Sequence, residues 1–114
     1  MNKKLLASSL LMSALLLTSC NFSFASTKLV VKDSTTYYVG QNYEQHNNAT
    51  AYLSSGLSKQ DVDFNGKDVT FHNHRDPDGQ SFNLSDPFSK IGQYSLTVKY
   101  KDKYSTTLKF NVAD

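Results

Sequence analysis

The chain has 114 residues and a mass of 12.8 kDa, which indicates one small domain. Hydrophobic residues make up 39% and charged residues 19%, with five Gly and two Pro, so collagen-like and low-complexity chains are excluded. The single Cys excludes an internal disulfide and a cysteine-based zinc site.

The first residues have the pattern of an export signal. Lys3 and Lys4 precede an apolar run at 5–17. A charged start followed by a run of this length is typical of a secretory signal peptide. A membrane-spanning helix needs about 20 apolar residues, so the run is too short to cross a bilayer.

The apolar run ends in a motif of four residues. Leu17-Thr18-Ser19-Cys20 resembles a bacterial lipobox, in which an apolar residue and two small residues precede a cysteine. The resemblance implies cleavage before Cys20, a thioether-linked diacylglycerol on its sulfur, and attachment to the extracytoplasmic side of the cell membrane. Two acyl chains anchor a protein stably, whereas one chain holds it only marginally.

A second cleavage site stays open. Ser23-Phe24-Ala25 fits the small-x-small rule for ordinary signal peptides. Cleavage after Ala25 would remove Cys20 and release a secreted protein without cysteine.

The lipoprotein interpretation divides the chain into a signal peptide at 1–19, a lipidated tether at 20–26 and a folded domain at 27–114. Loss of Lys3 and Lys4 leaves ten basic side chains against ten acidic ones. A neutral domain has no electrostatic footprint for nucleic acid. It also lacks a polybasic cluster for anionic lipid, so membrane contact is expected only through the lipid anchor. The six residues between the cysteine and the domain reach at most about 20 Å.

Residues 27–114 alternate between apolar and polar side chains, which is the period of half-buried strands. Short strand patterns occur at 29–31, 49–53, 62–64 and 69–72. Two polar stretches, at 42–48 and 75–87, are expected to be the long loops, and loops carry recognition.

The clearest pattern lies near the C-terminus. Four apolar side chains alternate with polar ones over 92–100, and the same period returns over 106–112 after a short polar turn. Two such segments predict a β-hairpin. All five Gly fall at breaks between the apolar patterns, and this spacing of turns is typical of an all-β sandwich or barrel.

Four segments, at 38–43, 48–53, 68–71 and 91–100, carry a family resemblance. Residues 38–43 (YVGQNY) and 92–100 (GQYSLTVKY) resemble the entry and the penultimate strand of bacterial Ig-like domains. The resemblance implies an Ig-like antiparallel β-sandwich of about seven strands. It also implies a tyrosine corner, in which the Tyr94 hydroxyl bonds to nearby backbone. Leu96 stands where antibody domains have a cysteine, and the chain has no Trp, so an antibody-type core is excluded.

One polar cluster contains residue types that bind metal ions. His72 and His74, two residues apart on a strand, would share a face, and Asp76 and Asp78 follow them. Zinc accepts such ligands, but no third or fourth ligand is fixed, and a strand that ends in a polar turn explains the same residues. Asp76-x-Asp78-Gly79 lacks the remaining ligands of a calcium loop. We therefore expect no metal and no cofactor.

No pattern predicts catalysis. The sequence has no G-x-S-x-G turn, and its one Glu, Glu44, lies in a polar stretch. Tyr37 and Tyr38 are neighbours, so on a strand one ring points inward and the other outward. An exposed tyrosine can stack on a sugar or anchor a partner.

Together these patterns predict a non-enzymatic surface lipoprotein whose Ig-like domain binds or scaffolds a protein or a cell-wall glycan. The alternative is a small secreted or anchored inhibitor or immunity protein that caps one enzyme or toxin. The alternative predicts one tight, stoichiometric partner, whereas the scaffold predicts a weak or polymeric ligand.

Overall fold

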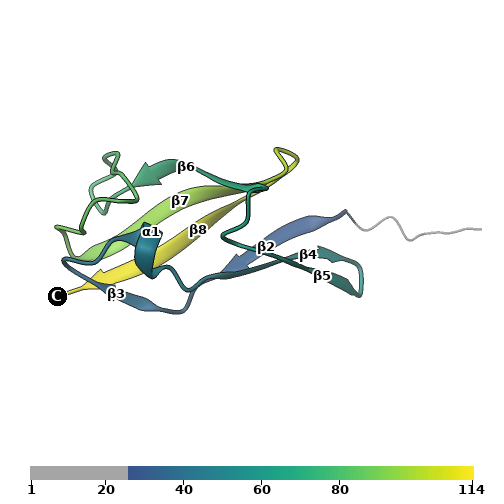
Figure 1. Cartoon of the computed structure of the whole chain (residues 1–114), viewed down its shortest axis with the longest axis horizontal. Helices are drawn as coiled ribbons and strands as arrows, with labels where there is room; N and C mark the ends of the chain where they lie inside the picture. Colours follow the sequence, from purple (N-terminus) through teal and green to yellow (C-terminus); the bar gives the residue numbers. More distant parts are fainter. Residues whose placement is uncertain (1–25) are drawn as a thin grey trace, which may run out of the picture. The chain divides into compact units, whose positions relative to one another are not determined.

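The computed structural model describes residues 26–114, which form seven strands and one single-turn helix (Figure 1). One compact unit, made of Lys28–Ser54 and Lys59–Asp114, holds the core. The elements in chain order are β2 (Lys28–Lys32), β3 (Thr36–Tyr38), α1 (Tyr43–His46), β4 (Thr50–Ser55), β5 (Ser58–Val62), β6 (Val69–Arg75), β7 (Gly92–Tyr100) and β8 (Tyr104–Ala113).

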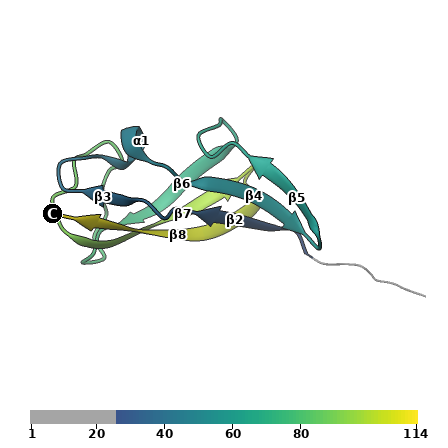
Figure 2. The same ribbon diagram turned by 90° about the horizontal axis from the view of Figure 1, so that it is seen from below.

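The strands form two packed sheets, so the predicted seven-strand all-β sandwich is confirmed. The first sheet has the order β2-β4-β5, and the second has the order β3-β8-β7-β6 (Figure 2). β2 pairs with β4, β6 with β7 and β7 with β8 in antiparallel fashion. β3 pairs with β8 in parallel, which departs from the expected wholly antiparallel sandwich. The departure arises because the chain leaves the first sheet after β2 and enters the second after a link of three residues.

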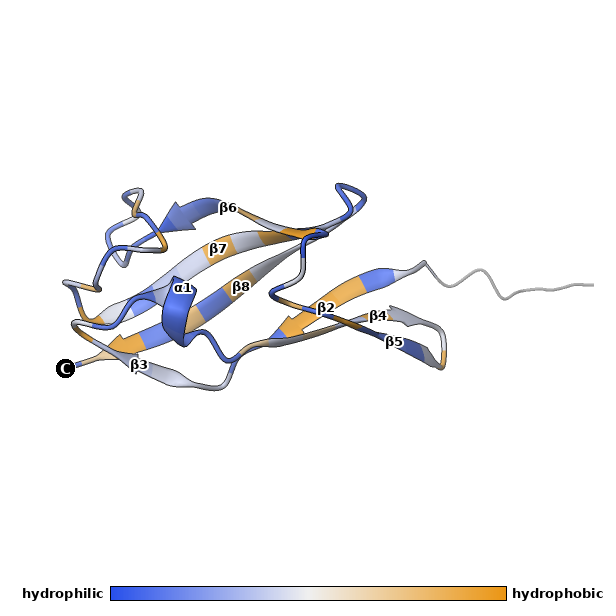
Figure 3. Cartoon of the chain, in the orientation of Figure 1, coloured by the Kyte–Doolittle hydropathy of each residue, from blue (hydrophilic) through white to orange (hydrophobic). Residues whose placement is uncertain are grey.

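The C-terminal hairpin was predicted, and the structure confirms it. β7 and β8 pair along their length, from Gly92 with Val112 to Tyr100 with Tyr104. Apolar and polar residues alternate along both strands (Figure 3), and the apolar ones face the core. β8 begins two residues earlier than expected, because the rings of Tyr100 and Tyr104 stack at 6.5 Å across the turn.

Of the weaker predicted strands, three form in place as β2, β4 and β6. The strand predicted at 62–64 was wrong in its bounds, since β5 spans Ser58–Val62. The Gly66 N–H donates to the Asp63 carbonyl at 3.0 Å, so the chain turns there. Phe64 lies in this turn and is buried, and its ring is tilted against that of Phe71 on β6 with the ring centroids 5.1 Å apart.

The core is built around the ring of Phe110 on β8. Tyr43 stacks on this ring at 4.5 Å and Tyr94 at 5.5 Å. Tyr37 meets it edge-on at 5.3 Å, and Phe88 lies 5.7 Å away. All five rings are at most 3% exposed. Aromatic pairs in these arrangements contribute about 0.5–1.5 kcal/mol beyond the area they bury.

Helix α1 lies inside the stretch 42–48 that was expected to be a loop. Asn42 caps it, since its side-chain oxygen accepts from the Gln45 N–H at 2.8 Å. Tyr43 is fully buried, and this burial holds the turn against the core. Across the described part of the chain, no helix has the length and apolar character needed to span a membrane.

Candidate functional site

The predicted lipidation site lies outside the described residues. Cys20, the signal peptide at 1–19 and all but the last residue of the tether at 20–26 fall before residue 26, where the description begins. The anchor therefore stays a prediction from the sequence.

The predicted tyrosine corner is confirmed. The Tyr94 hydroxyl donates to the Lys90 carbonyl at 2.8 Å and accepts from the Lys90 N–H at 3.3 Å. The Tyr94 side chain is 2% exposed, and this burial raises the pKa of its hydroxyl. The hydroxyl stays protonated as a result, and it ties the start of β7 to the loop that precedes it.

The two histidines do not share a face, so that expectation was wrong. From His72 to Arg75 the chain advances three residues, while the paired residues on β7 advance two, from Thr97 to Ser95. The extra residue forms a β-bulge, and Asn73 takes the left-handed conformation there with φ of 51°. The bulge reverses the alternation of the strand. His72 is therefore exposed, whereas the next histidine is partly buried.

Each histidine has its own local contact. The His72 Nε2 lies 2.9 Å from the Thr70 hydroxyl oxygen. The His74 Nδ1 lies 3.1 Å from the Phe82 carbonyl, and because a carbonyl only accepts, this nitrogen carries the hydrogen. The His74 Nε2 is buried without a hydrogen-bond partner among the described residues. Both histidines lie on β6, where His72 contacts the strand itself and His74 contacts the loop that follows it.

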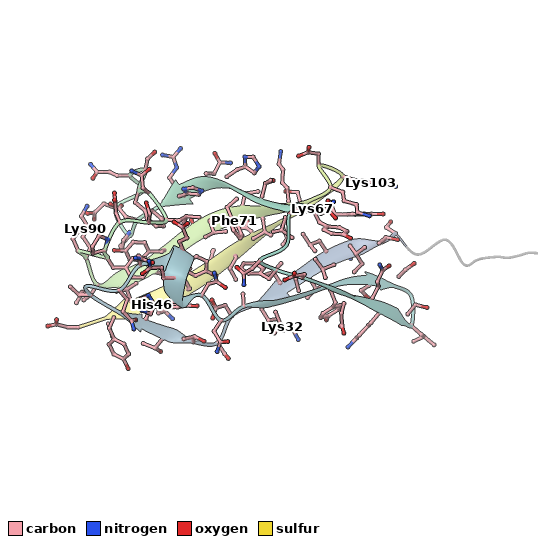
Figure 4. All side chains as sticks on the ribbon, in the orientation of Figure 1. Lys32, His46, Lys67, Phe71, Lys90 and Lys103 are labelled. Carbon is pink, nitrogen blue, oxygen red and sulfur yellow. The ribbon has the colours of Figure 1, made fainter. Side chains whose placement is uncertain are left out.

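A lysine ammonium occupies the middle of the turn that resembled a calcium loop. The Lys90 Nζ lies 2.9 Å from Asp76 Oδ2 and 2.8 Å from Asp78 Oδ2, and it also donates to Gln80 at 3.3 Å. Figure 4 labels Lys90 beside the loops that join β6 to β7. We call these four residues the lysine clamp. Within the described residues, no three potential metal ligands cluster.

The clamp changes the titration of its own members. The hydrogen bond from Lys90 lowers the pKa of the Asp76 carboxyl, and backbone N–H groups of Gln80 and Asp78 act in the same direction. Hydrogen bonds from Lys90 to Asp78 and Asp76 raise the pKa of the lysine. Both groups therefore stay charged at neutral pH, and the clamp holds the turn closed.

A second polar cluster lies where the chain changes sheets. Asp33 Oδ2 accepts from the hydroxyl of Tyr37 at 2.6 Å and from that of Tyr43 at 3.0 Å. The Thr35 N–H donates to Asp33 Oδ1 at 3.0 Å, and the Asn48 N–H donates to the Tyr37 hydroxyl at 2.9 Å. Burial raises the pKa of both tyrosines, and the neighbouring carboxylate adds to the shift. Neutral tyrosines of this kind are donors to a structural carboxylate, not bases.

The prediction for the neighbouring tyrosines is confirmed. Tyr37 is 1% exposed, whereas Tyr38 is 50% exposed. The Tyr38 N–H donates to the Gln41 side chain at 2.9 Å, which fixes the backbone beneath the exposed ring.

Two hollows, of about 260 and 330 Å³, lie beside the segment that ends β5. Asp61 and Asp63 line both, and both side chains are exposed to solvent. Carboxylate pairs that act as acid and base lie in different surroundings. Asp61 and Asp63 are both exposed to solvent, so the structure gives them no such difference in surroundings.

The comparisons with known proteins are negative. No family model matches the chain, and neither the curated proteins nor the solved structures include a match.

Proposed function

We propose that this chain is a non-enzymatic surface lipoprotein whose Ig-like domain binds a partner at the outer face of the cell membrane. The observation that carries the proposal is that the ion-paired and hydrogen-bonded side chains of the domain make structural contacts. Asp33, Asp76 and Lys90 are held by contacts that stabilise turns and the crossing between sheets. A sandwich whose polar contacts are structural in this way suits binding better than chemistry.

Two features support the Ig-like assignment. In Ig domains one sheet contains strands C, F and G, and a tyrosine near the start of F bonds back to upstream backbone. Here β6, β7 and β8 lie together in one sheet, and Tyr94 near the start of β7 makes that bond. The pairing of β5 directly with β4 departs from the usual order, since an Ig domain places strand E there.

The lipobox resemblance at Cys20 supports the anchor. β2 begins at Lys28, and the eight residues from Cys20 to Lys28 reach at most about 29 Å when fully extended. The domain would then stand close to the membrane surface, where envelope components are its nearest partners.

Membrane fractionation of the wild-type chain and of Cys20→Ser tests the anchor. We expect the wild type in the membrane fraction and the variant in the soluble fraction. Equal release of both chains, together with a mature N-terminus at Ser26 by mass spectrometry, would replace the anchored protein by the secreted one.

The class of partner is tested by pull-down with the full-length chain. A weak or polymeric envelope ligand is expected. A single protein captured at one-to-one stoichiometry would instead favour an inhibitor or immunity protein that caps an enzyme or toxin.

A further inference from the structure

The outer face of the four-stranded sheet is polar and carries only positive formal charges. On β7 and β8 the side chains that alternate with the core residues point outward, and cross-strand pairing aligns them in rows. One row joins Arg75, Ser95 and Lys109, and another joins Thr70, Lys99 and Ser105. Between these rows lie His72, Thr97 and Thr107. We call this surface the outer face.

The charge on this sheet is segregated from the rest of the domain. None of the four strands β3, β6, β7 and β8 contains an Asp or a Glu, although the chain has ten. The same strands contain Arg75, Lys99 and Lys109. Neither lysine forms an ion pair in the described part of the chain, where both salt bridges belong to Lys90. A domain without net charge therefore presents one cationic surface.

The position of the two lysines argues against the ordinary explanation for lysines on strands. Proteins place lysine on edge strands to prevent sheets from pairing with one another. Lys28, Lys32 and Lys59 fit that explanation, because β2 and β5 are the two edges of the other sheet (Figure 4 labels Lys32). Lys99 and Lys109 lie on β7 and β8, the two interior strands of their sheet.

An exposed aromatic ring lies on the same surface. Tyr38 on the edge strand β3 points away from the core, since its neighbour Tyr37 is buried, and it pairs in register with Ala113 of β8. Lys109 is four residues before Ala113, which is about 13 Å along the strand. A face with spaced cations, hydroxyl groups and one aromatic ring matches a sugar polymer that carries negative charges.

We propose that the outer face binds an anionic polysaccharide of the envelope in which the protein is anchored. Lys99 and Lys109 bind its carboxylate or sulfate groups, the Ser and Thr hydroxyls bond to its sugar hydroxyls, and Tyr38 stacks on a sugar ring. The inference rests on the proposed function, because only a short tether keeps the domain beside that envelope. It adds the chemical class of the ligand and the surface that recognises it.

The test uses the full-length chain in neutral detergent over immobilised polymers. The probes are polygalacturonic acid and heparin as carboxylated and sulfated polysaccharides, dextran as a neutral one, and inorganic polyphosphate as a polyanion without sugar. We expect binding to the two anionic polysaccharides that weakens as salt rises. The double variant Lys99→Gln/Lys109→Gln should raise their Kd by about tenfold or more, since each lysine makes a charge-assisted contact.

The matched control is Lys28→Gln/Lys32→Gln, which removes the same charge from the edge strand of the other sheet. It should change the Kd by less than about twofold. If both double variants lost the same affinity for the anionic polysaccharides, the outer face would not be the binding surface. Tyr38→Ala should weaken binding to polygalacturonic acid but not to polyphosphate, and an equal effect on both would remove the sugar-stacking role.

Other results separate this inference from the proposed function. If Lys99→Gln/Lys109→Gln still co-sediments with envelope fragments as the wild type does, the inference fails and the anchored binding module stands. Binding to phosphatidylglycerol vesicles in place of the polysaccharides, with the same dependence on the two lysines, would assign the face to lipid and overturn the inference. If the wild type binds no envelope component, both fail.

Discussion

Tyr37 donates a hydrogen bond of 2.6 Å to Asp33, and the two residues lie where the chain passes from one sheet to the other. Asp33 follows β2 of the first sheet, and Tyr37 is the middle residue of β3 in the second. Tyr43 adds a second bond to the same carboxylate oxygen. The crossing is therefore fixed by two buried phenols that must stay protonated.

This cluster predicts a loss of stability at alkaline pH. The folded-state pKa values of Tyr37 and Tyr43 are raised, while the unfolded chain ionises near pH 10. Above that pH the unfolded state releases protons that the folded state keeps. The free energy of unfolding should then fall by about 1.4 kcal/mol per pH unit for each tyrosine. Tyr43→Phe removes one of the two phenols. The free energy of unfolding of this variant should therefore fall less steeply above pH 10, by up to about 1.4 kcal/mol per pH unit.

Urea unfolding between pH 8 and pH 11 measures this slope. Tyr104→Phe is the control, because Tyr104 is only half-buried on β8 and lies outside the cluster. If the free energy of unfolding fell equally steeply with pH in the wild type and in Tyr43→Phe above pH 10, the prediction would be contradicted.

The tyrosine corner predicts a smaller, pH-independent effect near neutrality. Tyr94→Phe keeps the ring and removes the bond to the Lys90 carbonyl. We expect a loss of about 1 kcal/mol in the free energy of unfolding, the usual net contribution of one hydrogen bond. Chemical denaturation at pH 7 measures it. A loss no larger than that of Tyr104→Phe would mean that the corner adds nothing to stability.

The aromatic core predicts one large effect. Phe110 contacts the rings of Tyr37, Tyr43, Phe88 and Tyr94, so Phe110→Ala opens a cavity that four rings cannot fill without moving. We expect a loss of about 3–5 kcal/mol, measured by thermal or urea unfolding. Ile91→Ala, at a position that is 61% exposed, should cost less than about 0.5 kcal/mol. Similar losses in the two variants would contradict this assignment of the core.

The lysine clamp predicts an effect that disappears in acid. Lys90→Met leaves Asp76 and Asp78 without their cation, so the melting temperature at pH 7 should fall and backbone amides at 76–80 should exchange faster. The pKa of Asp76 is lowered in the folded state, so its contribution is present above the unfolded pKa of about 3.9 and is lost as pH falls through the folded value. The melting temperatures of wild type and variant should therefore converge at low pH.

Lys67→Met is the matched control, because Lys67 is an exposed lysine on another turn (Figure 4). It should leave the melting temperature nearly unchanged. Calcium at about 1 mM should also leave the wild type unchanged, since the Lys90 ammonium already lies between the two carboxylates. A rise in the melting temperature of the wild type on adding calcium would contradict this, because it would show that calcium can replace the Lys90 ammonium.

The parts of the fold that could be predicted are those that follow from patterns of neighbouring residues in the sequence. The C-terminal hairpin follows from alternation over two long segments, and the Tyr94 corner follows from the place of one tyrosine at the start of a strand. β3 was not resolvable as a separate strand, because it has three residues and pairs with residues about 75 positions later. Helix α1 has four residues, and its only local signal was the capping pair Asn42 and Gln45.

The polar sites depended on geometry that local patterns do not contain. The bulge at Asn73 reversed the strand alternation and separated the two histidines, and no Gly marks the position. The lysine clamp joins Lys90 to residues 12 and 14 positions away, so spacing alone did not reveal it. The two interior lysines became informative only when the strand order placed them away from the edges.

The strand order also sets when the second sheet can form. β8 is the last strand in the sequence, yet it lies between β3 and β7. A ribosome that has made only the earlier strands has produced a sheet without its centre, and closing contacts so far apart in sequence is slow. The four-stranded sheet therefore cannot close before β8 has been made, because β8 joins β3 to the β7–β6 pair.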